Sequence, residues 1–211
     1  MGQINLYQYP ISPFTEKVRR VLTFKKLKWN PIDCHYQDKT NLLAVTKGAW
    51  TRVPVLEWEG EVVYNSVDII KWLDRKVPKP RVIPDDARGL CEILDHWADN
   101  TLFIPILMLT IPDLLDSGDP QLKANREKLI GITTERMRAA APAHREALTS
   151  FCRVIDEQLA DKDFFLGGGF TLADASLYHP FFFLALNPHN FAMTDGFKNL
   201  RRWYERIHDL V

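Results

Sequence analysis

The chain has 211 residues, and its 27 lysines and arginines balance 27 aspartates and glutamates, so the formal net charge is zero. A chain without an excess of basic residues lacks the electrostatic footprint of proteins that bind nucleic acid or anionic membranes, and we expect neither partner. The length is sufficient for one large or two small domains with a buried core.

The cysteines and histidines give no sign of a metal site. Cys34, Cys91 and Cys152 are scattered and lack Cys-x-x-Cys spacing, and the six histidines show no metal-ligand spacing. Scattered cysteines favour a reduced setting, and the N-terminus lacks a basic region followed by a long apolar run. The longest apolar runs are too short to cross a bilayer. We therefore expect a cytoplasmic protein without a bound metal.

The first eighty residues alternate apolar segments with helical patterns. The alternation predicts strands at Ile4–Tyr9, Trp29–Cys34, Val53–Trp58 and Glu61–Tyr64, and helices at Thr15–Phe24, Leu42–Thr46 and Val67–Arg75. This order predicts an α/β unit with a mixed sheet. In the first helix, the charges of segment 16–20 are expected on the outer face.

A proline-rich polar segment, Lys76–Pro84, follows this unit and predicts a semi-stiff linker. We place one domain at residues 1–77 and a second at 86–211. The second half is expected to be all helical, with helices at Leu90–Ile111 (kinked at Pro105), Gln121–Ala140, Ala143–Ala160, Thr171–Leu186 and Phe197–Leu210.

The segment Ser12-Pro13-Phe14-Thr15 lies between the first strand and the first helix. Glutaredoxin-like proteins carry Cys-Pro-Phe/Tyr-Cys at such a place, but both sulfur positions are hydroxyls here. A hydroxyl cannot exchange disulfides, because that reaction needs a thiolate. A hydroxyl can donate a hydrogen bond to the thiolate of a bound molecule, so we expect the reactive sulfur to arrive with a ligand.

Five motifs occur in an order and spacing typical of one family: Ser12-Pro13-Phe14, Asp38-Lys39-Thr40, Arg52-Val53-Pro54-Val55-Leu56, Asn65-Ser66, and Gly168-Gly169-Phe170-Thr171-Leu172-Ala173-Asp174. Together they resemble the cytosolic glutathione S-transferase superfamily, and especially its serine-type classes, such as tau. The resemblance implies an α/β N-terminal thioredoxin-like domain and an all-α C-terminal helical domain. It also implies glutathione as co-substrate and a homodimer. The last motif contains a capping box at 171–174, which is structural.

The resemblance gives Ser12 the role of stabilising the glutathione thiolate, helped by the N-terminus of the first helix. The alternative is that Ser12 only caps that helix. Thr15 is expected to begin the helix rather than to take part in chemistry. Tyr7 and Tyr9 are interpreted mainly as packing residues, with Tyr9 as the reserve hydroxyl donor because some classes of the family use a tyrosine on this strand.

The other implied contacts concern the peptide part of glutathione. Val53 offers its backbone to the cysteinyl part, and Pro54 is expected to be cis; the alternative is an ordinary proline at a strand start. Lys39 and Arg52 are candidates for the glycyl carboxylate, or else are solvated surface charges.

Asn65 and Ser66 lie where the family binds the γ-glutamyl end, with Ser66 as the expected N-cap of the helix and the carboxylate at the helix N-terminus. Most relatives have Glu, Gln or Asp at the position of Asn65. A carboxylate would pair with the ligand's amino group, whereas an amide can only accept a hydrogen bond from it.

The second substrate is expected to be a small hydrophobic electrophile in a pocket that includes Ile11, Phe103 and Leu107, although most of the apolar stretch around Phe103 can equally be core. The function predicted is a glutathione transferase. The alternatives are a non-catalytic adaptor or regulatory protein of the same fold and a glutathione-dependent isomerase or dehalogenase. A thiol reductase is disfavoured because Ser12 and Thr15 replace both cysteines.

Overall fold

A four-stranded mixed sheet forms the N-terminal part of the computed structural model, which describes residues 2–116, 118 and 120–210. The strands are β1 (Ile4–Gln8), β2 (Trp29–Asp33), β3 (Val55–Trp58) and β4 (Glu61–Tyr64), in the order β2-β1-β3-β4. β1 runs parallel to β2, and the other two pairings are antiparallel. The mixed sheet predicted from the alternating pattern is therefore confirmed.

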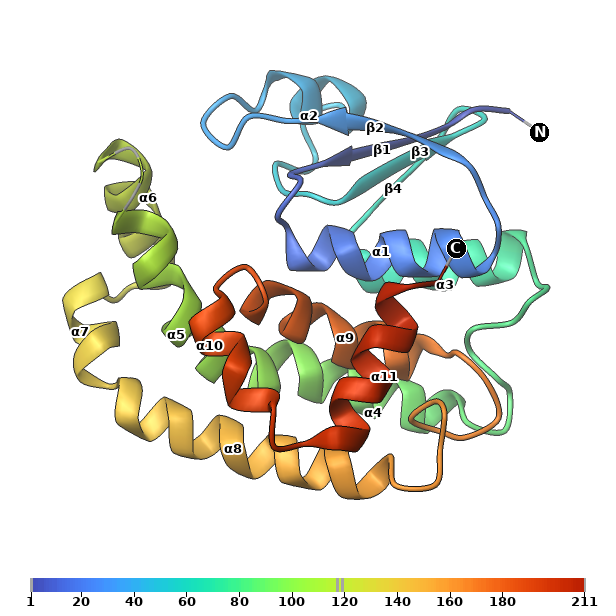
Figure 1. Cartoon of the computed structure of the whole chain (residues 1–211). Coiled ribbons are helices and arrows are strands. Elements are labelled where there is room, and N and C mark those ends of the chain that lie inside the picture. Colours follow the sequence, from blue (N-terminus) through green and yellow to red (C-terminus); the bar gives the residue numbers. More distant parts are fainter. Residues whose placement is uncertain (1, 117, 119, 211) are drawn as a thin grey trace.

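Three helices accompany the sheet: α1 (Pro13–Phe24), α2 (Thr40–Val45) and α3 (Ser66–Lys76). Figure 1 shows α1 and α3 between the sheet and the helical part of the molecule, with α2 on the other side of the sheet. α1 buries Val18, Val21 and Leu22, because residues three and four apart share a helix face. The apolar stripe of α1 therefore holds the first helix in place beneath the sheet.

The linker after α3 is packed rather than loose. The buried ammonium of Lys25 donates to Asp74 (2.9 Å) and to the carbonyl oxygens of Val77 (2.8 Å) and Pro80 (2.7 Å). Val82 has no exposed surface, and its N–H donates to Asp74 at 2.8 Å. The proline-rich composition predicts a semi-stiff spacer, but these contacts fix the segment against the N-terminal domain.

The second half is helical, as predicted. It contains α4 (Arg88–Trp97), η1 (Ala98–Leu102), α5 (Phe103–Asp116), α6 (Pro120–Ile130), α7 (Thr134–Ala139), α8 (Ala141–Gln158), α9 (Leu172–Leu184), α10 (Pro188–Phe191), η2 (Ala192–Thr194) and α11 (Lys198–His208). Figure 1 shows α6 rising beside the N-terminal domain, and Gln37 donates to Gln121 of α6 at 3.2 Å.

Two helix predictions need correction. The segment predicted at 90–111 is longer, and a π-helical turn, η1, interrupts it just before Pro105; in that turn the N–H of Phe103 donates to the carbonyl oxygen of Ala98, five residues back. The predicted single helix 121–140 is two helices. Gly131 adopts φ 79°, and the side chain of Thr133 caps α7.

The capping box that begins α9 is confirmed, and it is also a tertiary junction. Asp174 has no exposed surface, and its two carboxylate oxygens accept from the N–H and hydroxyl of Thr171 (both 2.9 Å), the N–H of Phe165 (2.7 Å) and the indole N–H of Trp203 (2.9 Å). Four donors of this kind are what a buried carboxylate requires. Asp174 therefore ties the start of α9 to α11.

A buried ionic network joins α1 to the helical half. Lys17 has no exposed surface and forms ion pairs with Asp95 and, at 3.0 Å, with Asp99. Ser176 donates to Asp95 at 2.7 Å, and Nε2 of the fully buried His179 lies 2.8 Å from Asp99. The prediction that the charges of this part of α1 lie on an outer face is therefore wrong for Lys17, which the helical half covers. It is also wrong for Glu16, which is 3% exposed and pairs with Arg19 and Arg20.

The continuous helical segment Arg88–Asp116 is long and apolar enough to cross a membrane by length and composition alone. Half of its most apolar window is buried inside the protein, where α5 packs against α8 and α9. Its apolar character is therefore that of a core helix in this fold.

Candidate active site

The sheet topology brings all the predicted glutathione-binding segments to one edge. β1 ends at this edge and leads to Ser12, β3 begins there after Pro54, and β4 ends there before Asn65. The pairing register places Val55 between Tyr7 and Tyr64. Because β2 is parallel to β1, the loop that carries Lys39 leaves at the same edge.

Ser12 caps α1 and keeps a hydroxyl proton available. Its Oγ accepts from the N–H of Thr15 at 3.3 Å, in the N-cap conformation, and Ser12 is 9% exposed. Within residues 2–116, 118 and 120–210, no acceptor takes the hydroxyl proton. The capping role is thus observed, and it is compatible with donation to a ligand because the two roles use different parts of the hydroxyl.

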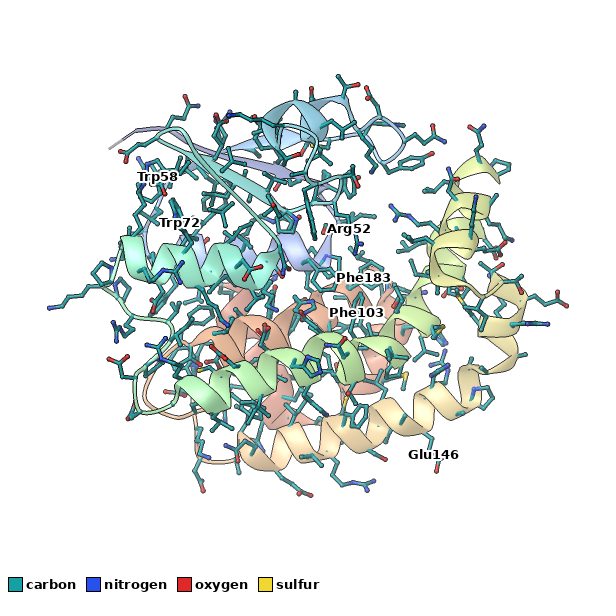
Figure 2. All side chains as sticks on the ribbon, turned by 180° about the vertical axis from the view of Figure 1, so that it is seen from behind. Arg52, Trp58, Trp72, Phe103, Glu146 and Phe183 are labelled. Atoms are coloured by element: carbon teal, nitrogen blue, oxygen red, sulfur yellow. The ribbon has the colours of Figure 1, made fainter. Side chains whose placement is uncertain are left out.

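The Val53–Pro54 peptide bond is cis, as the resemblance implies. Just before it, the guanidinium of Arg52 lies 5.4 Å from the ring centroid of Trp50, and Trp50 stacks on Tyr64 at 5.0 Å. Arg52 is exposed, and Figure 2 shows it at the side of the N-terminal domain that faces the helical half. The cis peptide and a cation therefore occupy neighbouring positions at the sheet edge.

Lys39 is not a freely solvated lysine. Its Nζ donates to the hydroxyl of Tyr9 at 2.6 Å and lies 5.3 Å from the centroid of that ring. Tyr7, two residues earlier, donates to Glu57 at 3.2 Å, and burial raises the pKa of its hydroxyl. Tyr9 therefore faces the lysine of the β2–α2 loop, whereas Tyr7 pairs across the sheet.

Asn65, not Ser66, is the N-cap of α3, which corrects the predicted cap. Asn65 has φ 72°, a left-handed conformation that asparagine tolerates better than most residues. Its Nδ2 donates to Asp68 at 3.0 Å, which leaves Oδ1 to accept from a ligand. Ser66 is 2% exposed, and its buried Oγ has no hydrogen-bond partner within the described part of the chain.

The three residues predicted to contact an electrophile lie in different surroundings. Ile11 is 52% exposed, Leu107 is half-buried, and Phe103 is only 8% exposed. The ring of Phe103 packs on Phe14 at 5.4 Å and on Phe183 at 5.7 Å, and Figure 2 shows Phe103 and Phe183 together below α1. Phe103 therefore packs beneath Phe14 and offers little exposed surface to a ligand.

The electrostatics of this edge favour an anion. The N-termini of α1 and α3 both lie there, and unpaired N–H groups and the helix dipole make such ends positive. Lys39 and Arg52 add two cations. Across residues 2–116, 118 and 120–210, no group of three or more His, Cys, Asp and Glu side chains can hold a metal ion. The edge suits a peptide with carboxylates and a thiolate.

Two site features were missed by sequence reasoning. Asp68 accepts the hydrogen bond of the Asn65 amide, and an acid three residues after this asparagine was an available signal. The Tyr9–Lys39 contact had no local signal, because the two residues are 30 positions apart and meet only through the sheet topology.

Comparison with known proteins covers both halves of the chain. The family model described as the N-terminal domain of glutathione S-transferase matches residues 6–81, and the C-terminal domain model matches residues 138–206. A probable glutathione S-transferase of Nicotiana tabacum is 23% identical over 96% of this chain and 82% of its own length. GSTU6, a probable glutathione S-transferase of Oryza sativa, is 27% identical over 83% of this chain and 70% of its own.

Solved structures share the fold. Glutathione transferase GSTFuA3 of Phanerochaete chrysosporium has a TM-score of 0.83 with 22% identity, over 98% of this chain and 96% of that one. A glutathione S-transferase of Ceriporiopsis subvermispora, solved in complex with glutathione, has a TM-score of 0.79 with 21% identity, over 99% of this chain and 98% of that one. Both family models match the chain, and its mixed-sheet domain, helical domain and cis-proline agree with them. The chain therefore belongs to the glutathione S-transferase family, whose members are transferases that use glutathione.

Proposed function

We propose that the protein is a glutathione transferase in which Ser12 stabilises the glutathione thiolate for attack on a small hydrophobic electrophile. In this proposal residues 1–77 bind glutathione, and residues 86–211 supply most of the electrophile side. The observation that carries the proposal is the meeting of two helix N-termini, a hydroxyl with an available proton and a cis-proline strand at one sheet edge.

The energetics of the thiolate are within reach of this arrangement. A free thiol titrates near pH 8.5, and lowering its pKa by about two units needs roughly 2.7 kcal/mol of preferential thiolate stabilisation. A hydrogen bond to a charged group contributes about 1.5–3 kcal/mol, and a helix N-terminus adds to it. Ser12 supplies the first and α1 supplies the second.

The peptide part of glutathione would be held by backbone and charge. Val53, before cis-Pro54, offers its main chain to the cysteinyl residue, in the manner of strand addition. Ser66 and the N-terminus of α3 would receive the γ-glutamyl carboxylate, and the buried, unpartnered Oγ of Ser66 gains a partner in that pose. The free Oδ1 of Asn65 would accept from the amino group.

Lys39 and Arg52 would receive the glycyl carboxylate. Both are cations at the same edge, and Lys39 is already ordered by Tyr9. In the reaction itself, the thiolate forms a bond to an electrophilic carbon and, with an aryl halide, the halide departs with its bonding electrons. Ile11, Leu107 and the edge of Phe103 would exclude water from the apolar partner.

The test is turnover of a generic aryl halide by the wild-type chain and by Ser12→Ala. We expect the variant to lose about 10²-fold in kcat/KM, in line with the loss of one hydrogen bond to a developing or bound anion. Unchanged turnover would remove Ser12 from the mechanism. Absence of any heat of glutathione binding in the wild-type chain would favour a protein that keeps the fold without catalysis.

We also propose that the chain forms a cytoplasmic homodimer. Leu90, Ile93 and Ile104 are large apolar residues on α4 and α5 that are 49%, 67% and 45% exposed. Leu90 and Ile93 are three residues apart and share one face of α4. Large apolar side chains that are exposed together typically mark a protein interface. Sedimentation should give a mass twice that of the 24.5 kDa chain, and Ile93→Glu should shift the protein to the monomer; a monomeric wild type would refute this assignment.

A further inference from the structure

The contact between Tyr9 and Lys39 orders a cation before any ligand arrives. The ammonium donates to the Tyr9 hydroxyl at 2.6 Å, and the same ammonium lies 5.3 Å from the ring centroid. A lysine side chain normally has several rotatable bonds to immobilise when it binds an anion. Because Tyr9 already restrains this lysine, binding a carboxylate loses less side-chain freedom.

The held ammonium still has donors to offer. An ammonium group has three N–H bonds, and Tyr9 uses one of them. Within the part of the chain that the structure describes, no carboxylate forms an ion pair with Lys39. The contact therefore fixes the position of the charge without neutralising it, which is what a waiting anion receptor requires.

The backbone brings Tyr9, and with it the Lys39 ammonium, close to Ser12. The N–H of Ser12 donates to the carbonyl oxygen of Tyr9 at 3.0 Å, which closes a turn of residues 9–12. The ends of such a turn lie within about 7 Å of each other. In glutathione the glycine directly follows the cysteine, and one extended residue spans about 3.3–3.6 Å. The span from a sulfur at Ser12 to a glycyl carboxylate at Lys39 is therefore of a length that glutathione can bridge.

We propose that Tyr9 is the positioning residue that holds Lys39 ready for the glycyl carboxylate of glutathione. This inference rests on the proposed glutathione transferase function and assigns Tyr9 a role in recognising the glycine rather than in activating the sulfur. Its hydroxyl accepts from the lysine ammonium, and the thiolate is left to Ser12.

The test compares two ligands, glutathione and γ-glutamylcysteine, the dipeptide that lacks the glycine. Dissociation constants are measured by calorimetry for the full wild-type chain, Tyr9→Phe and Lys39→Met. We expect Tyr9→Phe to weaken glutathione binding about tenfold, as for loss of one charge-assisted contact, and to change dipeptide binding by less than about twofold. Lys39→Met should show the same selectivity, and the double variant should be no worse than Lys39→Met.

The matched control is Tyr7→Phe. Tyr7 lies two residues earlier and its hydroxyl pairs with Glu57, so both ligands should bind as in the wild type. In steady-state kinetics, the Tyr9→Phe defect should fall on the KM for glutathione and not on kcat.

Three results would overturn the inference: equal weakening of both ligands by Tyr9→Phe, no weakening of either, or a Lys39→Met defect that is the same with and without the glycine. The comparison of the two ligands in Lys39→Met tests the recognition of the glycine even if Tyr9→Phe lowers the melting temperature. A wild-type chain that binds neither ligand would instead refute the proposed function.

Discussion

Removal of the Lys17 ammonium should destabilise the protein strongly, because this fully buried lysine is the cation that pairs with Asp95 and Asp99 at the junction of α1 and the helical half. It has no exposed surface, and its partners Asp95 and Asp99 come from α4 and η1. Lys17→Met keeps an unbranched side chain of similar length and removes the ammonium, with its charge and its N–H donors. The junction would then hold two carboxylates without their cation.

The magnitude follows from burial. Breaking a buried ion pair by removing one partner typically costs about 3–5 kcal/mol, because the remaining charge stays desolvated. The side chain of Asp95 is 10% exposed and that of Asp99 is 21% exposed, so water can relieve little of this cost. Total stabilities of single domains are about 5–15 kcal/mol, so the loss would be a large fraction of the whole.

The structure offers a matched control in Lys71, which also joins the two halves. Its ammonium lies 2.9 Å from Glu92 of α4, but the two side chains are 33% and 46% exposed. An exposed pair of this kind is worth about 0–1 kcal/mol. Lys71→Met should therefore have a small effect for the same change of residue type.

The assay is urea unfolding followed by circular dichroism. With a denaturant slope of about 2–3 kcal/mol per molar, Lys17→Met should lower the unfolding midpoint by about 1–2 M. Adding Asp99→Asn to Lys17→Met should cost less than Asp99→Asn does in the wild type. If Lys17→Met and Lys71→Met shift the midpoint equally, the burial argument is refuted.

Two further outcomes follow from buried titrating groups. Burial lowers the pKa of His179, so between its folded pKa and about 6.5 the unfolded chain binds more protons than the folded chain. The free energy of unfolding should therefore fall on acidification through that window, by up to about 1.4 kcal/mol per pH unit. His179→Phe should flatten this pH dependence, measured by urea unfolding from pH 7.5 to 5.5, and identical slopes in the two proteins would contradict the assignment. A thiol reagent should modify only the half-buried Cys34 in the native chain and all three cysteines in denaturant. The reason is that Cys91 and Cys152 are buried, and burial raises the pKa of Cys152 to about 12. Rapid modification of a second thiol in the native chain would contradict this packing.

Local patterns were sufficient for the order of strands and helices in the N-terminal domain. The alternation of strand and helix signals predicts the mixed sheet. The predicted start of the first helix at Thr15 is wrong, because α1 begins at Pro13 with Ser12 as its N-cap. The cis bond at Pro54 follows only from the family resemblance, because cis bonds are about 5–6% of X–Pro bonds in folded proteins.

The features that could not be predicted depend mostly on contacts between residues far apart in the sequence. Lys17 looks like a surface lysine, and its burial depends on Asp95 and Asp99, which lie about 80 positions away in the sequence. The break at Gly131 in the predicted helix 121–140 was underestimated, because one glycine in a helical pattern is often tolerated. The Tyr9–Lys39 contact likewise depends on the parallel pairing of β1 and β2, which places two loops at one sheet edge.

The most direct measurement is the pKa of the glutathione thiol while it is bound to the protein, read from the ultraviolet absorbance of the thiolate during a pH titration. The account predicts that the pKa in the wild-type chain lies about two units below that of free glutathione. In Ser12→Ala, with glutathione still bound, the pKa should rise most of the way back to the free value. A bound thiol that titrates like free glutathione in the wild type, or an unchanged depression in Ser12→Ala, would contradict it.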